Sequence, residues 1–566
     1  MSNVAPLSPG KPSFRELFVP KFVTVLREGY DAARFRADAI AALTVAVVAL
    51  PLSMAIAIAS GAPPERGLTT AIVGGFLISL LGGSRFQIGG PAGAFIVLVA
   101  ATIEQKGLDG LLLATLMAGI IQILIGYLRL GGYIRYIPHP VIVGFTTGVA
   151  VIIFASQIRD LFGLTIAGKE PAALVPKLQT LWDATGVNVS AALIASVSLA
   201  LILGLRRFRP HWPGFLIAVA LASLAVWALQ LPAETIGSRF GSIPRSLPAP
   251  ALPELSLARI AELLPYAAAI ALLGGIESLL SAVVADGMTG RRHRSNCELV
   301  AQGAANIGSA LFGGICATGT IARTATNIRA GAVGPVSGML HSIFLLLMML
   351  IAAPLMGEIP LAALAAILAV VAWNMAEKHE FLAILRSSRG DAAVLLATFF
   401  LTIFHDLTAG IAVGVAMGSL LFMHRMASLM AVETHAPLLS DDRADNGREA
   451  REPYAGRGGL AEDVIVYRLA GPLFFGTAST LGSVLERIGE KPRRYILDMS
   501  QAAFADHSAA VTIGAFADRA RRGGASVTIA GASPQVRRTL SHNGLRPPRL
   551  VYAASVAAAL AQSPED

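Results

Sequence analysis

The chain has 566 residues, of which 54% are apolar and only 14% are charged. This charge content lies well below the roughly 25% of a soluble globular protein, and it excludes intrinsic disorder, collagen and coiled coil as the bulk structure. The formal net charge of +9 would by itself suggest a nucleic acid or an anionic lipid as partner. The basic excess falls almost entirely within residues 1–430, however, which hold 29 basic and 21 acidic side chains.

Residues 1–37 form a polar segment in which no basic stretch is followed by an apolar core, so we expect no cleavable signal peptide. The two cysteines, Cys297 and Cys316, cannot form a disulfide framework in a chain of this length. Their spacing is also not that of a zinc site, so we expect no structural metal.

Fourteen apolar stretches follow, and they predict a transmembrane domain over residues 38–430. About 20 apolar residues cross a bilayer, and a broken half-helix needs fewer. Two of the stretches, 89–104 and 318–330, are too short and too rich in small residues to cross alone. The fourteen lie near 39–60, 67–82, 89–104, 110–128, 138–158, 188–205, 213–231, 260–286, 297–313, 318–330, 332–356, 360–376, 391–405 and 407–429.

The distribution of basic residues predicts the orientation, because loops on the cytoplasmic side carry an excess of Lys and Arg. Placing the N-terminus in the cytoplasm puts 20 Lys and Arg residues inside and eight outside. Fourteen spans then return the C-terminus to the cytoplasm. We therefore expect a multi-pass protein of the cell (inner) membrane with both termini cytoplasmic.

The two short stretches resemble each other, since each is the third span of a seven-span half and each follows a glycine-rich run. Paired, glycine-interrupted segments at matching positions are typical of a binding site between inverted repeats, although small residues also serve tight helix packing. Two helix N-termini that meet in mid-membrane would form an anion site without a buried formal charge. Gly93 and Gly319 would let the backbone approach a ligand closely.

Two ionisable residues lie deep within apolar spans. Glu277 occupies the middle of the eighth span, where we interpret it as a proton- or cation-binding carboxylate rather than a carboxyl that only packs helices. Ser281, one turn further on, faces the same side and could supply a second oxygen. Arg323 lies one turn beyond Gly319, where it either deepens an anion site or neutralises Glu277 as a structural pair.

The last part of the chain has a different pattern. Residues 431–461 read as a linker, and residues 462–566 contain strands alternating with helices, which predicts a small α/β domain with a largely parallel sheet. No glycine-rich phosphate loop follows a strand, so nucleotide hydrolysis is not expected. The strands are expected at 464–469, 495–499 and 526–530, and the helices near 477–489, 508–522 and 534–541.

Several of these motifs resemble the SulP family of sulfate-permease-like anion transporters with a C-terminal STAS domain. Residues 277–290, 295–296 and 298–306 resemble the signature around the eighth span, and residues 317–327 resemble that of the tenth. Residues 471–475 and 497–500 resemble the STAS domain. The resemblance covers residues from about 35 to 560.

The resemblance implies fourteen transmembrane segments built as seven-plus-seven inverted repeats, divided into a core and a gate domain. It also implies elevator-like movement of the core and a homodimer. The coupling-cation residues map to Glu277 and, for sodium, Ser281. The anion-binding residues map to Ala92, Gly93, Ala94, Phe95, Ile321, Ala322 and Arg323, with Leu52 where the family often has a glutamine that can face the anion.

The chain departs from the family pattern at three places. Leu52 makes the site less polar than the usual glutamine would, and Cys316 replaces the proline that precedes the tenth span. In place of the Asp-Ser-Ser-Gly of stand-alone STAS regulators the chain reads 506–509 as Asp-His-Ser-Ala. We interpret Asp506 or Ser508 as a helix cap rather than Ser508 as a phosphorylation site.

These observations predict secondary active uptake of a small anion (bicarbonate, sulfate or a C4-dicarboxylate) coupled to protons or sodium. An anion exchanger or an uncoupled anion channel of the same fold is the alternative. A nucleobase permease shares the architecture, and a membrane-tethered signalling scaffold would use the STAS domain as its working end. No nucleophile–base pair, metal cluster or phosphate loop supports an enzyme, and the only ion expected besides the anion is a proton or sodium.

Overall fold

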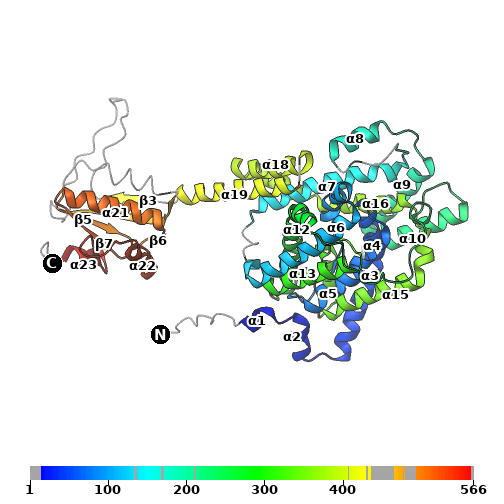
Figure 1. Ribbon diagram of the computed structural model, residues 1–566, viewed down its shortest axis with the longest axis horizontal. Coiled ribbons are helices and arrows are strands. Elements are labelled where there is room, and N and C mark those ends of the chain that lie inside the picture. The colour runs from blue at the N-terminus through cyan, green and yellow to red at the C-terminus, as the bar shows by residue number, and fades with distance from the viewer. Residues whose placement is uncertain are drawn as a thin grey trace. The chain divides into compact units, whose positions relative to one another are not determined.

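The computed structural model describes residues 14–132, 137–166, 171, 173–209, 212–405, 407–428, 431–434, 464–475, 477 and 492–561. The chain divides into two compact units, Met1–Gly418 and Ser419–Asp566. The first unit is a bundle of helices, and the second is a small sheet with helices packed on it (Figure 1).

The first half of the membrane unit begins with two short helices and then enters the apolar region. Its elements are α1 (Phe14–Phe18), α2 (Lys21–Arg27), α3 (Ala32–Ala59), α4 (Pro64–Thr69), the π-helix η1 (Thr70–Gly74), α5 (Gly75–Leu81), β1 (Gly89–Gly90), the 3₁₀ turn η2 (Gly93–Phe95), α6 (Ile96–Tyr127), α7 (His139–Phe162), α8 (Leu174–Trp182), α9 (Val189–Phe208), α10 (Gly214–Leu229) and α11 (Ile236–Phe240).

The second half repeats the pattern of a short strand followed by a helix. Its elements are α12 (Leu257–Thr289), α13 (Ser295–Leu311), β2 (Thr318–Gly319), α14 (Ile321–Arg329), α15 (Val336–Gly357), α16 (Leu361–Met375), α17 (Lys378–Ser387), α18 (Arg389–Phe404) and α19 (Leu407–Ser428).

Each of the fourteen predicted spans coincides with helical structure. Within the described residues, eight helical stretches are long and apolar enough to cross a membrane by themselves, and the other predicted spans are shorter helices. The predicted third and fourth spans are joined as α6, which is kinked at Gly107, where φ is +72°. Such a φ is unfavourable for a residue with a Cβ, so glycine permits the break between the two spans.

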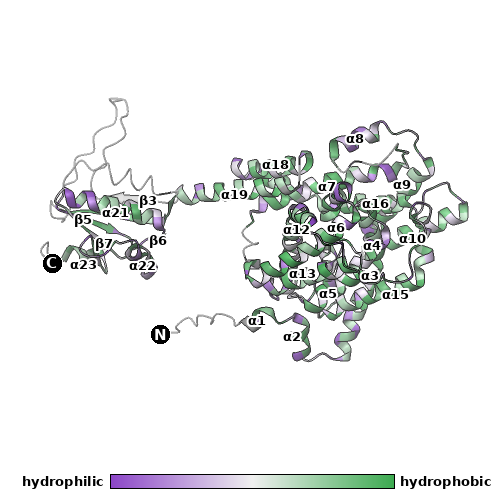
Figure 2. Ribbon diagram, in the orientation of Figure 1, coloured by the Kyte–Doolittle hydropathy of each residue, from purple (hydrophilic) through white to green (hydrophobic). Residues whose placement is uncertain are grey.

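The outward faces of this unit are apolar, as a bilayer requires. Figure 2 shows that most residues of the bundle's helices are hydrophobic. Large apolar side chains stand exposed along α9 and α10, as on a surface that faces lipid. Examples are Leu193, Val197, Leu203, Leu221 and Trp227.

Helices α6 and α13 cross at a pair of glycines. A Cβ added to Gly303 would lie 2.4 Å from the backbone oxygen of Gly119, and one added to Gly119 would lie 2.6 Å from the backbone oxygen of Gly303. The two backbones therefore touch directly, as small residues allow in membrane helix pairs. This crossing joins the two sequence halves of the bundle.

The second unit contains a mainly parallel sheet in the order β3-β4-β5-β7-β8, with β6 paired to β4. Only β3 runs antiparallel to its neighbour. Helix α21 begins at the N-cap Asp506, whose side chain accepts a hydrogen bond from the N–H of Ala509, as predicted. The elements are β3 (Ala431–Thr434), β4 (Val464–Leu473), β5 (Arg494–Asp498), β6 (Ala502–Ala505), α21 (His507–Arg522), β7 (Ser526–Ala530), α22 (Pro534–His542), β8 (Val551–Ala553) and α23 (Val556–Ala561).

The predicted parallel sheet and two of its helices are therefore present. Residues 431–434 were expected to belong to the linker, but they form β3, because they pair with β4, which lies about 30 residues further along the chain. Residues 435–461 of that linker, and the helix expected near 477–489, lie outside the described residues except for Thr477.

A buried carboxylate holds the end of β5 in the second unit. Asp498 accepts hydrogen bonds from the N–H of Ser500 at 2.9 Å and from Arg468 Nε at 3.3 Å. Burial alone would raise the pKa of Asp498, but these hydrogen bonds outweigh it and hold the pKa below its ordinary value. The ionised form is therefore favoured by folding, and this contribution is lost as the pH falls through the folded pKa.

The glycine crossing of α6 and α13 predicts a strong position effect. Gly303→Ala should destabilise the full-length protein by about 1–3 kcal/mol, the usual cost of overpacking a core. Gly204→Ala is the matched control, because a Cβ there meets no atom within 4 Å. The midpoint temperature of unfolding is measured by size-exclusion chromatography of detergent-solubilised protein after heating. Equal midpoints for the two variants would contradict a direct backbone contact.

The contacts of Asp498 predict a pH effect confined to the second unit. Asp498→Ala should weaken this unit by about 1–3 kcal/mol at neutral pH, because two donors lose their acceptor. Hydrogen exchange of the full-length protein should show faster exchange in β5 and β7. Acidification below the ordinary Asp pKa of about 4 should reduce protection in the wild type more than in the variant. The same pH dependence in both would rule out Asp498 as its source.

Candidate functional site

The two glycine-rich segments predicted to form the site lie side by side. β1 pairs antiparallel with β2, so that Gly89 lies opposite Gly319 and Gly90 opposite Thr318. A helix begins shortly after each strand, η2 with α6 after β1 and α14 after β2. The two helix starts therefore follow the two strands of one short ladder, as expected for paired half-helices.

Neither helix start is capped by a side chain. Ala92 precedes η2 and Thr320 precedes α14, and neither side chain accepts a hydrogen bond from the first turn of its helix. The first backbone N–H groups of a helix lack partners within the helix and together carry about half a positive charge. Two uncapped helix starts at one place can therefore hold an anion.

Glycine is needed in both strands because side chains pack onto their backbones. Gly90 has φ of +153°, and a Cβ there would lie 2.4 Å from Arg323 Nη1. A Cβ on Gly319 would lie 1.7 Å from Gln87 Nε2. The ladder is thus covered by Arg323 on one side and by Gln87 on another.

Arg323 brings a buried positive charge to this ladder. Its side chain is only 3% exposed, and Nη2 donates to Ser53 Oγ and to the carbonyl oxygen of Pro91, both at 3.2 Å. Nε and Nη1 have no partner among the residues that the structure describes. The structure shows no ion pair between Arg323 and Glu277, so the structural-pair alternative is not realised in this conformation. Unused donors remain beside the two helix starts.

The predicted anion-binding residues differ in their exposure. Ile321 is 40% exposed and Ala322 is also exposed, whereas Gly93 is half-buried. A Cβ on Gly93 would lie 3.7 Å from Met375 Sδ and 3.8 Å from Ile153 Cδ1, so Gly93 faces α16 and α7. The remaining predicted residues are buried, namely Leu52, Ala92, Ala94 and Phe95.

Ser53 was not predicted, although it directly follows Leu52 in the first-span pattern. Its hydroxyl accepts from Arg323 and is fully buried. A hydroxyl within an apolar span is a usable sequence signal, but nothing in the chain's local pattern links it to an arginine 270 residues later.

The predicted cation residues lie on α12 but have different surroundings. Glu277 is half-buried, and no described residue donates a hydrogen bond to it or pairs with it. Ser281 is fully buried, and its Oγ donates to Thr324 Oγ1 at 3.1 Å, which in turn accepts from the N–H of Ile88. The donation leaves the lone pairs of Ser281 Oγ available.

A carboxylate and a hydroxyl are hard oxygen ligands, so this pair suits a proton or a sodium ion better than a transition metal. Within the described residues, no group of three or more His, Cys, Asp or Glu side chains could hold a metal ion.

The structure buries two further carboxylates that the sequence pattern did not indicate, because only Glu277 was expected to lie deep within a span. Asp38 accepts from the N–H groups of Val333 at 2.6 Å and Gly334 at 3.1 Å. Glu298 accepts from those of Gly83 at 2.8 Å and Ser84 at 2.9 Å. Both lie near predicted span ends, where sequence alone favours exposure. Each carboxylate thus accepts hydrogen bonds from two backbone N–H groups of a loop. Both therefore anchor loops and are not free carboxylates.

Polar side chains of neighbouring helices hold β2 in place. Asn306 Oδ1 accepts from the N–H of Ala317 at 2.8 Å, and Asn306 Nδ2 donates to Gln122 Oε1 at 2.9 Å. Thr318 Oγ1 donates to the carbonyl oxygen of Gly274 at 3.0 Å. Gln122 also donates to the carbonyl oxygen of Ala271 at 3.1 Å, so it links α6 to both α12 and α13 next to the segment that carries β2.

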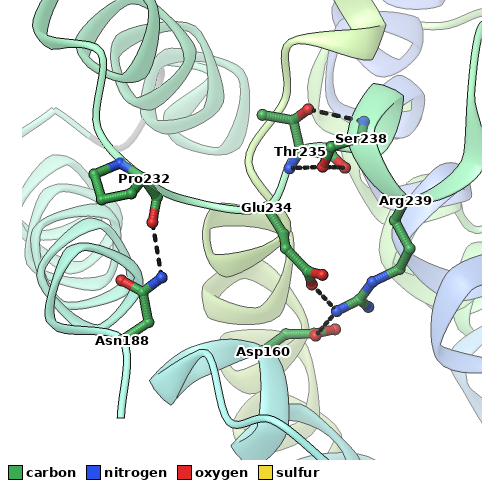
Figure 3. Close-up of polar contacts among 7 residues, drawn as sticks. All are labelled: Asp160, Asn188, Pro232, Glu234, Thr235, Ser238 and Arg239. Atoms are coloured by element: carbon green, nitrogen blue, oxygen red, sulfur yellow. Dashed lines mark hydrogen bonds and ion pairs between the residues drawn. The ribbon is translucent and has the colours of Figure 1, made fainter. Parts of the chain in front are cut away.

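A cavity of about 460 Å³ lies at the end of the bundle where α3 and α7 finish and α16 begins. Its wall contains Ala55, three residues beyond Leu52, but none of the predicted anion-binding residues. Arg239 lines it and donates to Asp160 Oδ1 at 2.9 Å and to Glu234 (Figure 3). These contacts tie the segment containing α11 to α7 beside the cavity.

Comparison with known proteins identifies the family. A model described as the sulfate permease family matches residues 35–398, and a STAS domain model matches residues 460–554. The chain belongs to the sulfate permease family. It is a multi-pass membrane protein with a C-terminal STAS domain, as predicted. Members of this family are transporters and not enzymes, which confirms that expectation.

Two curated relatives are similar over almost the whole chain. The putative sulfate transporter YvdB of Bacillus subtilis (strain 168) is 43% identical over 523 residues, which cover 92% of this chain and 95% of the relative. The bicarbonate transporter BicA of Picosynechococcus sp. is 30% identical over 521 residues, covering 89% of this chain and 90% of the relative.

Solved structures share the fold. The structure of the murine solute carrier 26 family member A9 anion transporter in the inward-facing state matches with a TM-score of 0.83 at 20% identity, covering 98% of this chain and 96% of that chain. The transmembrane domain of a cyanobacterium bicarbonate transporter BicA matches with a TM-score of 0.60 at 31% identity, covering 69% of this chain and 98% of that chain. The membrane unit and the STAS domain thus have the architecture predicted from the sequence.

The surroundings of Arg323 predict its effect on anion binding. Arg323→Gln should remove most of the stabilisation by bound anion, because it deletes the formal charge at the ladder. Arg329→Gln is the control, since Arg329 lies exposed at the other end of the same helix. The measurement is the rise in unfolding temperature of detergent-solubilised protein on addition of bicarbonate or sulfate. An unchanged rise in the Arg323 variant would contradict this placement of the site.

Proposed function

We propose that the protein is a secondary active transporter that takes up a small anion together with a proton or a sodium ion. The observation that supports this most strongly is the buried guanidinium of Arg323, which keeps unused donors beside two uncapped helix starts. The names of the relatives, a putative sulfate transporter and a bicarbonate transporter, support an oxyanion as substrate. A C4-dicarboxylate is the third candidate, from the resemblance to the SulP family.

In the proposed mechanism the anion binds between η2 and α14 and accepts hydrogen bonds from their first N–H groups and from Arg323. Glu277 binds the cation, and Ser281 adds an oxygen if the cation is sodium. The core then moves as one body against the gate helices, in an elevator-like step. A membrane disfavours any added buried charge, so movement is easiest when loading leaves the charge of the core unchanged.

This charge condition separates the candidate substrates. One monovalent anion bound together with one cation adds no net charge, whereas sulfate with one cation adds a charge of −1. Glu277 provides one carboxylate and can take up one positive charge. We therefore favour bicarbonate over sulfate for a single coupling ion, and sulfate would require a second cation.

We further propose that the protein lies in the inner membrane with both termini in the cytoplasm and that it works as a homodimer. The distribution of basic residues supports the orientation. The alternative function is anion exchange or uncoupled anion conduction, for which the free carboxylate of Glu277 would have no coupling role.

A panel of uptake experiments tests the proposed function. Purified protein in liposomes is given labelled bicarbonate, sulfate, fumarate or chloride, each with an imposed sodium or proton gradient. We expect gradient-driven accumulation of bicarbonate with one cation per anion. Uptake that ignores both gradients, with current that has no fixed stoichiometry, would instead establish the channel alternative.

The coupling role of Glu277 gives a sharper prediction. Glu277→Gln should abolish gradient-driven accumulation, because a neutral amide cannot exchange a proton or balance a cation. Anion-induced stabilisation should persist, since Glu277 makes no contact with Arg323. Glu358→Gln is the control, because Glu358 is exposed at the end of α15. Concentrative uptake by the Glu277 variant at the wild-type rate would rule out this role.

A further inference from the structure

Basic side chains from three distant segments meet where α2 packs against the bundle. Lys21 lies on α2, Arg85 lies in the loop after α5, and Arg291 and Arg294 lie in the loop between α12 and α13. We call these four residues the α2 basic cluster. The proposed transport cycle uses none of them.

Backbone contacts fix the three segments to one another. The N–H of Lys21 donates to the carbonyl oxygen of Gly82 at 2.8 Å, and that of Arg294 donates to Gly83 at 3.0 Å. Arg294 Nη1 also donates to the carbonyl oxygen of Val19 at 2.7 Å and to a threonine hydroxyl of α2. The cluster is therefore a built arrangement and not a set of independent surface chains.

Positive charge exceeds negative charge in this arrangement. Two nearby carboxylates are already engaged: both oxygens of Glu28 accept from Arg85, and Asp286 accepts from the ring and the backbone N–H of His293. Lys21 has no hydrogen-bond or ion-pair partner for its ammonium group among the described residues. Glu298, which accepts from the N–H groups of Gly83 and Ser84, is a third nearby carboxylate, so four cations face three carboxylates.

The state of Lys21 reflects this imbalance. Burial lowers the pKa of Lys21, and the positive charges of Arg294 and Arg85 lower it further, while Asp286 and Glu28 offset this only in part. The ammonium form of Lys21 is therefore disfavoured by its surroundings in the absence of another anion.

Exposed apolar side chains lie on the same helix as Lys21 and on the helix that follows it. Leu26 at the end of α2 is 48% exposed, and Phe35 and Ile40 near the start of α3 are 49% and 54% exposed. Helix α2 thus carries both a basic and an exposed apolar side chain just before the first membrane span, which is the level of the lipid headgroups.

We propose that Lys21, Arg291 and Arg294 form a binding site for the phosphate of an anionic lipid headgroup. The lipid anion supplies the missing negative charge and fastens α2 to the loops at Gly82 and Arg294. This site is separate from the ladder of β1 and β2, so it holds whatever anion is transported.

Lys21→Gln tests the site in nanodiscs of defined composition, with Arg386→Gln as the matched control because Arg386 is an exposed basic residue of α17. In pure phosphatidylcholine, Lys21→Gln should unfold at the same temperature as the wild type or at a higher one, because like-charge repulsion is removed. In nanodiscs that contain about 20% phosphatidylglycerol, the wild type should become the more stable protein.

Native mass spectrometry of the same samples gives a second readout. The wild type should retain phosphatidylglycerol about fivefold more strongly than Lys21→Gln, while Arg386→Gln should retain it like the wild type. Equal retention and equal stabilisation in all three proteins would overturn the proposed site.

A third arm separates lipid from soluble phosphate. Sodium phosphate is added to the phosphatidylcholine nanodiscs at constant ionic strength. We expect no change in unfolding temperature. If phosphate alone reproduces the effect of phosphatidylglycerol, and Lys21→Gln abolishes it, the site takes a soluble phosphate and the assignment to lipid is wrong.

Discussion

The structure depends on a constraint that membranes impose on the backbone: an N–H or C=O group in the apolar region is costly unless it is paired or lines a ligand site. The segments around β1 and β2 leave the helical conformation there, so their backbone groups need other partners. The β1–β2 ladder supplies some of them, and Asn306, Thr324 and Gln302 supply others to Ala317 and Ile88. The irregular backbone is thus tolerated because the two sequence halves supply hydrogen-bond partners to each other.

The same arrangement explains why a guanidinium can lie at the centre of an apolar bundle. Arg323 is placed by Ser53 and by the carbonyl oxygen of Pro91, neither of which neutralises it. A buried charge without a counter-charge is costly, and an arriving anion relieves that cost. The free energy that the buried charge costs in the empty site is recovered when an anion binds, and it therefore contributes to the affinity for the anion.

The sequence predicted the helices and the position of the site because both follow local rules. Apolar length located all fourteen spans, and the paired glycines located the ladder. The sequence did not predict Ser53, Asp38 or Glu298 as buried polar partners, since each contact joins residues more than 200 positions apart. It likewise missed β3, because four residues carry too little pattern to outweigh a linker-like context.

The two missed carboxylates have a consequence for how the protein is made. Asp38, in α3, holds the loop at Gly334, and Glu298 holds the loop at Gly83. Each half of the chain therefore contains a polar group whose backbone partners belong to the other half. The first seven spans by themselves lack the partners of Asp38, so these contacts of the core are complete only when the chain as far as residue 334 is in place. Completion of the binding site is in this way a late event in assembly, coupled to near-complete insertion of the membrane unit.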